Sequence, residues 1–219
     1  MRIGILGSGL MGGKLGTLFT QAGHDVVFSY SRSSKKLDRL ASNAGERARA
    51  GSPREATQES ELLLLAVHWS RVDEVLRLAG DLSGKVLVTC SLPMNADDTE
   101  LVVAHTSSGA EALAQKAVGA KVVSAFGSVP SEVLFDVFGG KGNGAPPNMM
   151  YCGDDHDAKE IVAGLIREIG FEPTDVGGLD SARYIEPFTM LIAKLAYESD
   201  GGPEVAYRFE WLGRVSRER

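Results

Sequence analysis

Three glycines near the start of the chain have the spacing of a phosphate-binding loop. The segment reads Gly7-Ser8-Gly9-Leu10-Met11-Gly12, a G-x-G-x-x-G pattern that directly follows the apolar run Ile3–Leu6. In this pattern the first glycine permits a tight turn, the second lets a pyrophosphate lie against bare backbone, and the third lets a helix pack closely on a strand. The first N–H groups of that helix and its dipole attract anions. We therefore expect this segment to bind the pyrophosphate of a dinucleotide.

The residues after the next apolar run, Val26–Tyr30, indicate which dinucleotide is bound. NAD-binding units usually place Asp or Glu at this point to hold the ribose hydroxyls. This chain instead has Ser31, Arg32 and Lys36, with no carboxylate nearby. Hydroxyl and cationic groups suit a 2′-phosphate, and a guanidinium can also stack on adenine. The segment predicts NADP(H) rather than NAD(H), the alternative being a solvated basic loop.

The elements that must position these residues alternate between strand and helix. Apolar runs predict strands at Ile3–Leu6, Val26–Tyr30, Leu62–Ala66, Val86–Thr89, Val122–Ala125, Met149–Tyr151 and Glu172–Val176. Helices are expected at Met11–Ala22, Ser34–Asn43, Arg71–Ala79, Gly109–Ala117, Asp155–Ile169 and within Arg183–Glu198, the last starting or kinking at Pro187. Strands that are apolar on consecutive residues are buried on both faces. The order predicts a doubly wound α/β fold of the Rossmann type, with a mainly parallel sheet.

The length of 219 residues allows one such domain with a small addition. We expect an NADP-binding domain over residues 1–150 and a small α/β extension over residues 151–219, packed on it as one compact unit. The glycine-rich segment Phe138–Asn148 is a functional loop or an idle connection. Too few residues follow the last predicted strand for the helical substrate domain of 3-hydroxyisobutyrate-type dehydrogenases or pyrroline-5-carboxylate reductases.

Composition excludes several function classes. The net charge of −6 argues against general nucleic-acid binding, and no apolar run approaches the roughly 20 residues of a membrane helix. Two cysteines without C-x-x-C spacing predict reduced thiols in a cytoplasmic protein, with Cys90 as a buried inert thiol. The four histidines have no metal-ligand spacing, so we expect no metal. His24, His105 and His156 are interpreted as surface residues.

Several segments together resemble one family. AVHW at 66–69, KVVSAF at 121–126, CGDDHDAKEIVAGLIREIGFEPTDVG at 152–177 and LDSARYIEP at 179–187 follow the two motifs above in order. The chain thereby resembles the NADPH-dependent reductases of coenzyme F420, the 8-hydroxy-5-deazaflavin:NADP oxidoreductases, up to about Leu195. The cytoplasmic domain of six-transmembrane metalloreductases shares this domain.

The resemblance implies a homodimer and a distribution of site residues. The cofactor would lie on the glycine motif, on Ser31, Arg32 and Lys36, and on Val67, His68 and Trp69. From the residues alone, His68 is either a ligand contact or an ordinary loop residue, and Trp69 either walls the pocket or packs under the next helix. Ser91, Leu92 and Pro93 would lie beside the nicotinamide. The acceptor would lie against the C-terminal helix, near the segment Ala125-Phe126-Gly127-Ser128-Val129-Pro130.

One departure from the family concerns Gly127, which stands where the deazaflavin reductases carry a histidine. The absence of a histidine side chain at this position removes a hydrogen-bonding group and opens space. Hydride transfer needs mainly two stacked rings and no essential proton carrier, so we assign no catalytic side chain.

The resulting hypothesis is an NADPH-dependent oxidoreductase with a planar small-molecule acceptor, with coenzyme F420 as the leading candidate. One alternative is a reductase of FMN, FAD or another small acceptor. Another is an NADP(H)-binding redox sensor that performs no chemistry.

Overall fold

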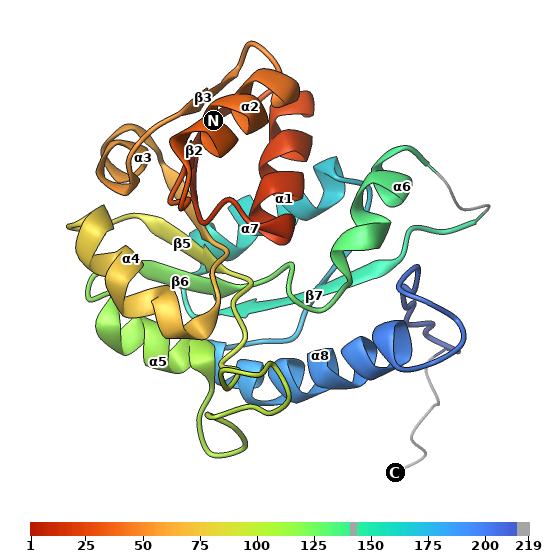
Figure 1. Ribbon diagram of the computed structural model, residues 1–219. Coiled ribbons are helices and arrows are strands. Elements are labelled where there is room, and N and C mark those ends of the chain that lie inside the picture. Colours follow the sequence, from red (N-terminus) through yellow and green to blue (C-terminus); the bar gives the residue numbers. More distant parts are fainter. Residues whose placement is uncertain (141–143, 214–219) are drawn as a thin grey trace.

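A single eight-stranded sheet forms the centre of the molecule. The computed structural model describes residues 1–140 and 144–213, and the strands follow the order β3-β2-β1-β4-β5-β6-β7-β8 (Figure 1). Neighbouring strands are parallel except β6 and β7, which are antiparallel. The bounds are β1 Arg2–Leu6, β2 Asp25–Ser29, β3 Ala48–Ala50, β4 Leu62–Leu65, β5 Val86–Thr89, β6 Lys121–Ser124, β7 Asn148–Gly153 and β8 Glu172–Asp175.

Helices cover both faces of this sheet and create two apolar cores. Alternate residues of one strand enter different cores: Leu62 and Leu64 of β4 join one, whereas Leu63 and Leu65 join the other. The first core is covered by α1 Leu10–Gln21, α2 Ser34–Ala44, α6 Leu134–Phe138 and α7 His156–Glu168. The second is covered by α3 Pro53–Glu59, α4 Val72–Ala79, α5 Gly109–Lys116 and α8 Ala182–Tyr197. The doubly wound, mainly parallel fold predicted from the sequence is confirmed.

Some elements differ from the sequence-based expectation. β3, α3 and α6 were not predicted, and each is short: three, seven and five residues. Such lengths give too few residues to show a hydrophobic period. α3 does carry a start signal, because Ser52 and Glu55 form a reciprocal capping box before a proline at the first helical position.

The antiparallel β7 also departs from a simple alternation. Ser124 of β6 pairs with Cys152 near the end of β7, so β7 begins beyond the carboxyl end of β6 and runs back along it. In the described part of the connection between these strands, the regular elements are the short 3-10 turn Ser131–Val133 and α6, rather than a crossover helix that returns the chain to the opposite edge. The connecting segment therefore stays at the carboxyl edge of the sheet, where ligands bind in this fold.

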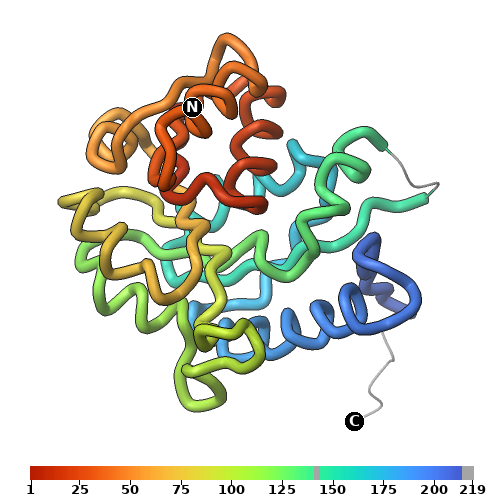
Figure 2. The backbone as a smooth tube through the Cα atoms, in the orientation of Figure 1, coloured from red at the N-terminus to blue at the C-terminus, as the bar shows by residue number. Residues whose placement is uncertain are grey.

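The C-terminal helix and the residues after it close one side of that edge. α8 begins at Ala182 and continues through Pro187 to Tyr197. The chain then turns back beside the start of β7 (Figure 2), where Asn148 N donates to the Tyr207 carbonyl at 2.9 Å. The Tyr207 ring packs edge-on against Phe188 with centroids 5.1 Å apart. The segment after α8 is thus fixed to the sheet.

His24 is not a surface residue as the sequence suggested. Only 7% of it is exposed, and its Nε2 lies 2.6 Å from a carboxylate oxygen of Glu168 while its Nδ1 lies 3.2 Å from the N-terminal amine. These polar partners on α7 and at Met1 are distant in sequence, which is why no local pattern reveals them.

Candidate dinucleotide and acceptor site

The glycine motif forms a tight turn between β1 and α1. Gly7 has φ +119°, and a side chain there would bring its Cβ within 2.4 Å of the Ala66 carbonyl oxygen. Its N–H donates to the Ser29 carbonyl at 3.1 Å, which ties the turn to β2. A Cβ on Gly12 would lie 2.0 Å from the Gly7 carbonyl oxygen. Both glycines are therefore required by packing among protein atoms.

Gly9 differs from these two glycines. A Cβ placed on it meets no protein atom within 4 Å. Gly9 caps the twelve-residue helix α1, whose start has no side-chain cap and no acidic residue in its first turn. The bare backbone and the first N–H groups of α1 thus face open space, which fits the pyrophosphate of a dinucleotide.

A pocket of about 390 Å³ extends from this turn. It lies at the carboxyl ends of β1, β2 and β4, where the strand order changes direction, the usual ligand position in this fold. Its walls include eight of the residues that the sequence assigned to the cofactor. The lining residues are Gly7, Ser8, Gly9, Tyr30, Ser31, Arg32, Ser33, Lys36, Ala66, Val67, His68 and Arg71.

Tyr30 and Arg71 were not predicted from the sequence. Tyr30 has φ +56°, an uncommon backbone conformation for a bulky residue, and its carbonyl accepts the Ser8 N–H at 3.3 Å. Arg71 ends the 3-10 turn Trp69–Arg71 after β4. A single basic residue in this segment does not by itself indicate a binding site, so the sequence did not reveal it.

His68 lies between this pocket and the loop after β5. Its Nε2 is 3.2 Å from the Asn95 carbonyl and 3.1 Å from a carboxylate oxygen of Asp98. The ring is half-buried and is thus held at the pocket wall by a segment distant in sequence.

A second cleft, of about 300 Å³, begins where the first pocket ends. Gly9 lines the dinucleotide pocket, and the next two residues of α1 line this cleft. The lining residues, mostly apolar, are Leu10, Met11, Cys90, Leu92, Gly127, Val129, Pro130, Ser131, Thr189, Ile192, Ala193 and Tyr197. α8 thus forms one wall, opposite the turn 127–131.

The titratable groups of this cleft remain uncharged at neutral pH. Burial raises the pKa of the Cys90 thiol to about 12. The residue as a whole is half-buried and lines the cleft, whereas the sequence suggested full burial. The Tyr197 hydroxyl donates to the Glu132 carboxylate at 3.0 Å. Partial burial and this carboxylate raise the pKa of Tyr197 to about 12. The residues that line the cleft are therefore neutral, although the charged side chains of Lys14 and Glu132 contact two of them, Ser131 and Tyr197.

Behind this cleft lies a polar interior that includes Glu186 of α8. A cavity of about 10 Å³, close to the volume that one water needs, is lined by Ser91, Ala125, Gly127, Ser128 and Glu186 among others. The Glu186 carboxylate accepts the N–H groups of Gly109 and Ala110 at 2.9 and 3.0 Å. Burial raises its pKa to about 7, although these two hydrogen bonds oppose the rise.

Comparison with known proteins agrees with this geometry. Residues 2–93 match the family described as NADP oxidoreductase, coenzyme F420-dependent. The F420-dependent NADP reductase of Methanocaldococcus jannaschii is 28% identical, over 92% of this chain and 96% of its own length. The chain is thus similar to the F420-dependent NADP reductases over most of its length. It is an NADP-dependent oxidoreductase.

Two further similar proteins extend this comparison. The metalloreductase STEAP3 of Rattus norvegicus is 33% identical over 84% of this chain, and the chain spans only 36% of the length of that protein. A solved structure from Arthrobacter sp. FB24, provisionally assigned as an F420-dependent NADP reductase, has a TM-score of 0.85 at 22% identity. It covers 96% of this chain and 100% of its own, which shows that the fold is shared.

Four residues assigned to the site from sequence line neither the dinucleotide pocket, nor the second cleft, nor the small cavity behind that cleft. Gly12 is used in packing α1 on β1, and Pro93 packs against Gly109 at the start of α5. Trp69 is half-buried and packs against the core under α4, which favours the packing interpretation. Phe126 is fully buried in the core, where its ring meets Phe19 with centroids 5.8 Å apart.

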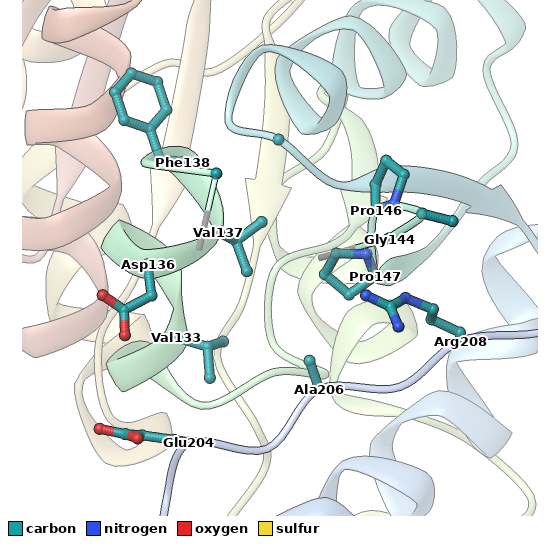
Figure 3. A pocket seen from close by; sticks show the side chains of 13 residues that line it. Val133, Asp136, Val137, Phe138, Gly144, Pro146, Pro147, Glu204, Ala206 and Arg208 are labelled. Carbon is teal, nitrogen blue, oxygen red and sulfur yellow. The ribbon is translucent and has the colours of Figure 1, made fainter. Parts of the chain in front are cut away.

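A larger cavity lies elsewhere in the reductase-like fold. It measures about 580 Å³ and lies between α6, the segment 144–147 and the C-terminal residues Glu204, Ala206 and Arg208 (Figure 3). Part of the glycine-rich loop expected from the sequence borders it, but residues 141–143 lie outside the described structure. None of the predicted site residues lines this cavity.

Two negative findings apply to the described ranges 1–140 and 144–213. No group of His, Cys, Asp and Glu side chains there could hold a metal ion. No helix within those ranges is long and apolar enough to cross a membrane.

Proposed function

We propose that this protein transfers hydride between NADP(H) and a flat, conjugated acceptor, with coenzyme F420 as the leading acceptor. The observation that carries this proposal is the junction of two unlike cavities at the start of α1. Gly9 borders the charged dinucleotide pocket, whereas Leu10 and Met11 border the neutral cleft. A hydride donor that spans this junction would meet an acceptor in the apolar part.

The dinucleotide pocket provides a binding group for each part of the cofactor. Backbone at Gly7, Ser8 and Gly9 would hold the pyrophosphate, and Ser31, Arg32 and Lys36 would hold the adenosine 2′-phosphate. When bound, NADPH supplies a hydride from C4 of its nicotinamide. The protein's part is to orient that ring and to exclude water from it.

The neutral cleft suits an uncharged planar ring. Leu92, Val129 and Ile192 supply apolar walls, and Gly127 contributes bare backbone, with a Cβ at that position 3.3 Å from the Cys90 carbonyl. The relatives named F420-dependent NADP reductase favour a deazaflavin ring. FMN or FAD is the second candidate, because an isoalloxazine ring has the same planar shape as a deazaflavin.

The experiment compares acceptors at one enzyme concentration. NADPH oxidation is followed with coenzyme F420, FMN, FAD and ferric citrate in parallel, with NADH as the alternative donor. We expect multiple turnovers with NADPH and F420. Turnover only with a flavin would show that the acceptor is a flavin and not coenzyme F420. Absence of turnover with every acceptor would contradict the proposal and favour a non-catalytic sensor.

We also propose that the protein forms a homodimer. Three large side chains lie exposed on the outer face of α8. The solvent-exposed fractions of Tyr184, Leu191 and Leu195 are 75, 54 and 46%. Such a row of exposed apolar side chains favours burial against a second copy. Sedimentation equilibrium should give twice the chain mass, and Leu191→Glu should lower it to that of a monomer. A wild-type monomer at micromolar concentration would contradict this.

A further inference from the structure

Arg71 is a third cationic residue of the dinucleotide pocket. It lines the same cavity as Arg32 and Lys36, although it comes from the turn after β4 rather than from the segment after β2. We propose that Arg71 binds the adenosine 2′-phosphate and helps to select NADPH over NADH. This inference rests on the proposed placement of the 2′-phosphate beside Arg32.

The position of Arg71 is fixed by the backbone and by one carboxylate. Its N–H donates to the His68 carbonyl at 2.8 Å, which closes the 3-10 turn. Its Nη1 donates to Glu74 Oε2 at 3.1 Å, one turn further along α4. A guanidinium carries five N–H donors in a planar fork. The remaining donors can therefore reach an anion while Glu74 holds the side chain at the pocket wall.

Tyr30 connects the two arginines. Burial and the neighbouring Glu74 carboxylate raise the Tyr30 pKa, whereas the charges of Arg71 and Arg32 lower it. Both guanidinium groups thus lie within electrostatic reach of one phenol. Tyr30 belongs to the pocket itself, and its carbonyl accepts the Ser8 N–H of the phosphate loop. The two arginines therefore flank the same part of the pocket from different elements.

The charge balance of this group suits a phosphate monoester. Arg71 is 49% exposed and Glu74 42% exposed, so their ion pair is screened by water and leaves Arg71 able to turn toward a doubly charged ligand. A nicotinamide dinucleotide without the 2′-phosphate offers no such charge at this position. Arg71 should therefore affect affinity for the phosphorylated form alone.

The test uses two adenosine fragments that differ by the 2′-phosphate. Binding of 2′,5′-ADP and 5′-AMP to Arg71→Ala, Arg71→Lys and wild type is measured by calorimetry. We expect Arg71→Ala to weaken 2′,5′-ADP by about three- to tenfold and 5′-AMP by less than about twofold, with partial recovery in Arg71→Lys. Arg77→Ala is the matched control, because Arg77 is exposed on the last turn of α4 outside the pocket.

Two results would overturn the inference. Equal weakening of both fragments would mean that Arg71 contacts adenine or ribose and does not read the phosphate. Unchanged binding of both would mean that it contacts neither. Arg32→Ala is measured in parallel: selective loss there with no effect at Arg71 leaves the proposed function intact, whereas no effect at either arginine contradicts the placement of the 2′-phosphate itself.

A charge-removing variant on the other partner sharpens the result. Glu74→Gln keeps an oxygen that can accept from Arg71 but removes the opposing charge. We expect 2′,5′-ADP to bind about two- to fivefold more tightly and 5′-AMP to be unchanged, with the gain lost at 1 M salt. A weaker affinity for 2′,5′-ADP in Glu74→Gln would contradict an attractive role for the Arg71 charge.

Discussion

The two ends of the site lie at the same edge of one sheet but use opposite chemistry. The dinucleotide end carries Arg32, Lys36 and Arg71, which remain exposed and charged. At the acceptor end the cleft-lining Cys90 and Tyr197 have pKa values raised to about 12, and Glu186 behind it to about 7. The comparison shows how one fold separates the two tasks: hydrated cations recognise the phosphates, whereas neutral groups surround the rings that exchange hydride.

The glycines offer the largest effect with which to sharpen this comparison. Gly9→Ala places a methyl group in open space, so we expect the free energy of unfolding to change by less than about 1 kcal/mol, while both NADPH and NADH bind about 100-fold more weakly. Gly12→Ala should instead lower the free energy of unfolding by about 1–3 kcal/mol, because its Cβ meets the Gly7 carbonyl oxygen. Urea unfolding and calorimetry separate the two. Normal dinucleotide affinity in Gly9→Ala would contradict a pyrophosphate at this position.

Glu186 provides the next test, at the acceptor end. Its pKa of about 7 in the folded protein exceeds the ordinary value of 4.5, so the stability that it contributes is present below pH 4.5 and is lost as pH rises through 7. The stability advantage of wild type over Glu186→Gln should therefore shrink by on the order of 2 kcal/mol between pH 5 and pH 8. Urea unfolding of both proteins at these two pH values measures it. An advantage that grows with pH would mean that the Gly109 and Ala110 N–H groups outweigh burial.

Arg32 tests the cation that the sequence itself predicted. Arg32→Ala should weaken NADPH by about 1–3 kcal/mol, while NADH is nearly unaffected, because a charge-assisted contact to the 2′-phosphate is lost. Fluorescence titration of both dinucleotides gives the ratio. Equal affinity of the wild-type protein for NADPH and NADH would contradict the interpretation of the whole segment from Ser31 to Lys36.

Gly127 gives the smallest expected effect and reports on the acceptor end alone. A Cβ there fits tightly against Cys90, so Gly127→Ala should lower kcat/KM for the acceptor by about fivefold and leave the NADPH dissociation constant unchanged. Gly164→Ala on α7 is the control, since its Cβ meets nothing within 4 Å. A change in NADPH affinity in Gly127→Ala would show that the two ends are not separate.

The sequence revealed the local features of this molecule better than those that depend on long-range contacts. The central strands were visible because residues such as Leu62–Leu65 are buried on both faces. Most of the dinucleotide pocket was foreseeable because its residues from Gly7 to Lys36 follow two consecutive strands, β1 and β2, of one contiguous strand-helix-strand unit. Arg71 was missed because its place at the pocket depends on how β4 lies beside β1, and the buried His24 was missed because its partners are distant in sequence. Phe126 was assigned to the acceptor site because of its position along the chain. It adopts φ +66°, and its side chain is buried in the core instead.

The most direct test of the central claim follows the hydride itself. NADPH carrying deuterium at the transferred C4 position is mixed with the protein and coenzyme F420 in a single turnover, and the product is examined by mass spectrometry. If the apolar cleft holds the acceptor ring against the nicotinamide and excludes water, the deuterium will be recovered on carbon in the reduced deazaflavin, with a measurable isotope effect on the rate. Reduced F420 without deuterium, or no reduced F420 at all, would contradict the account.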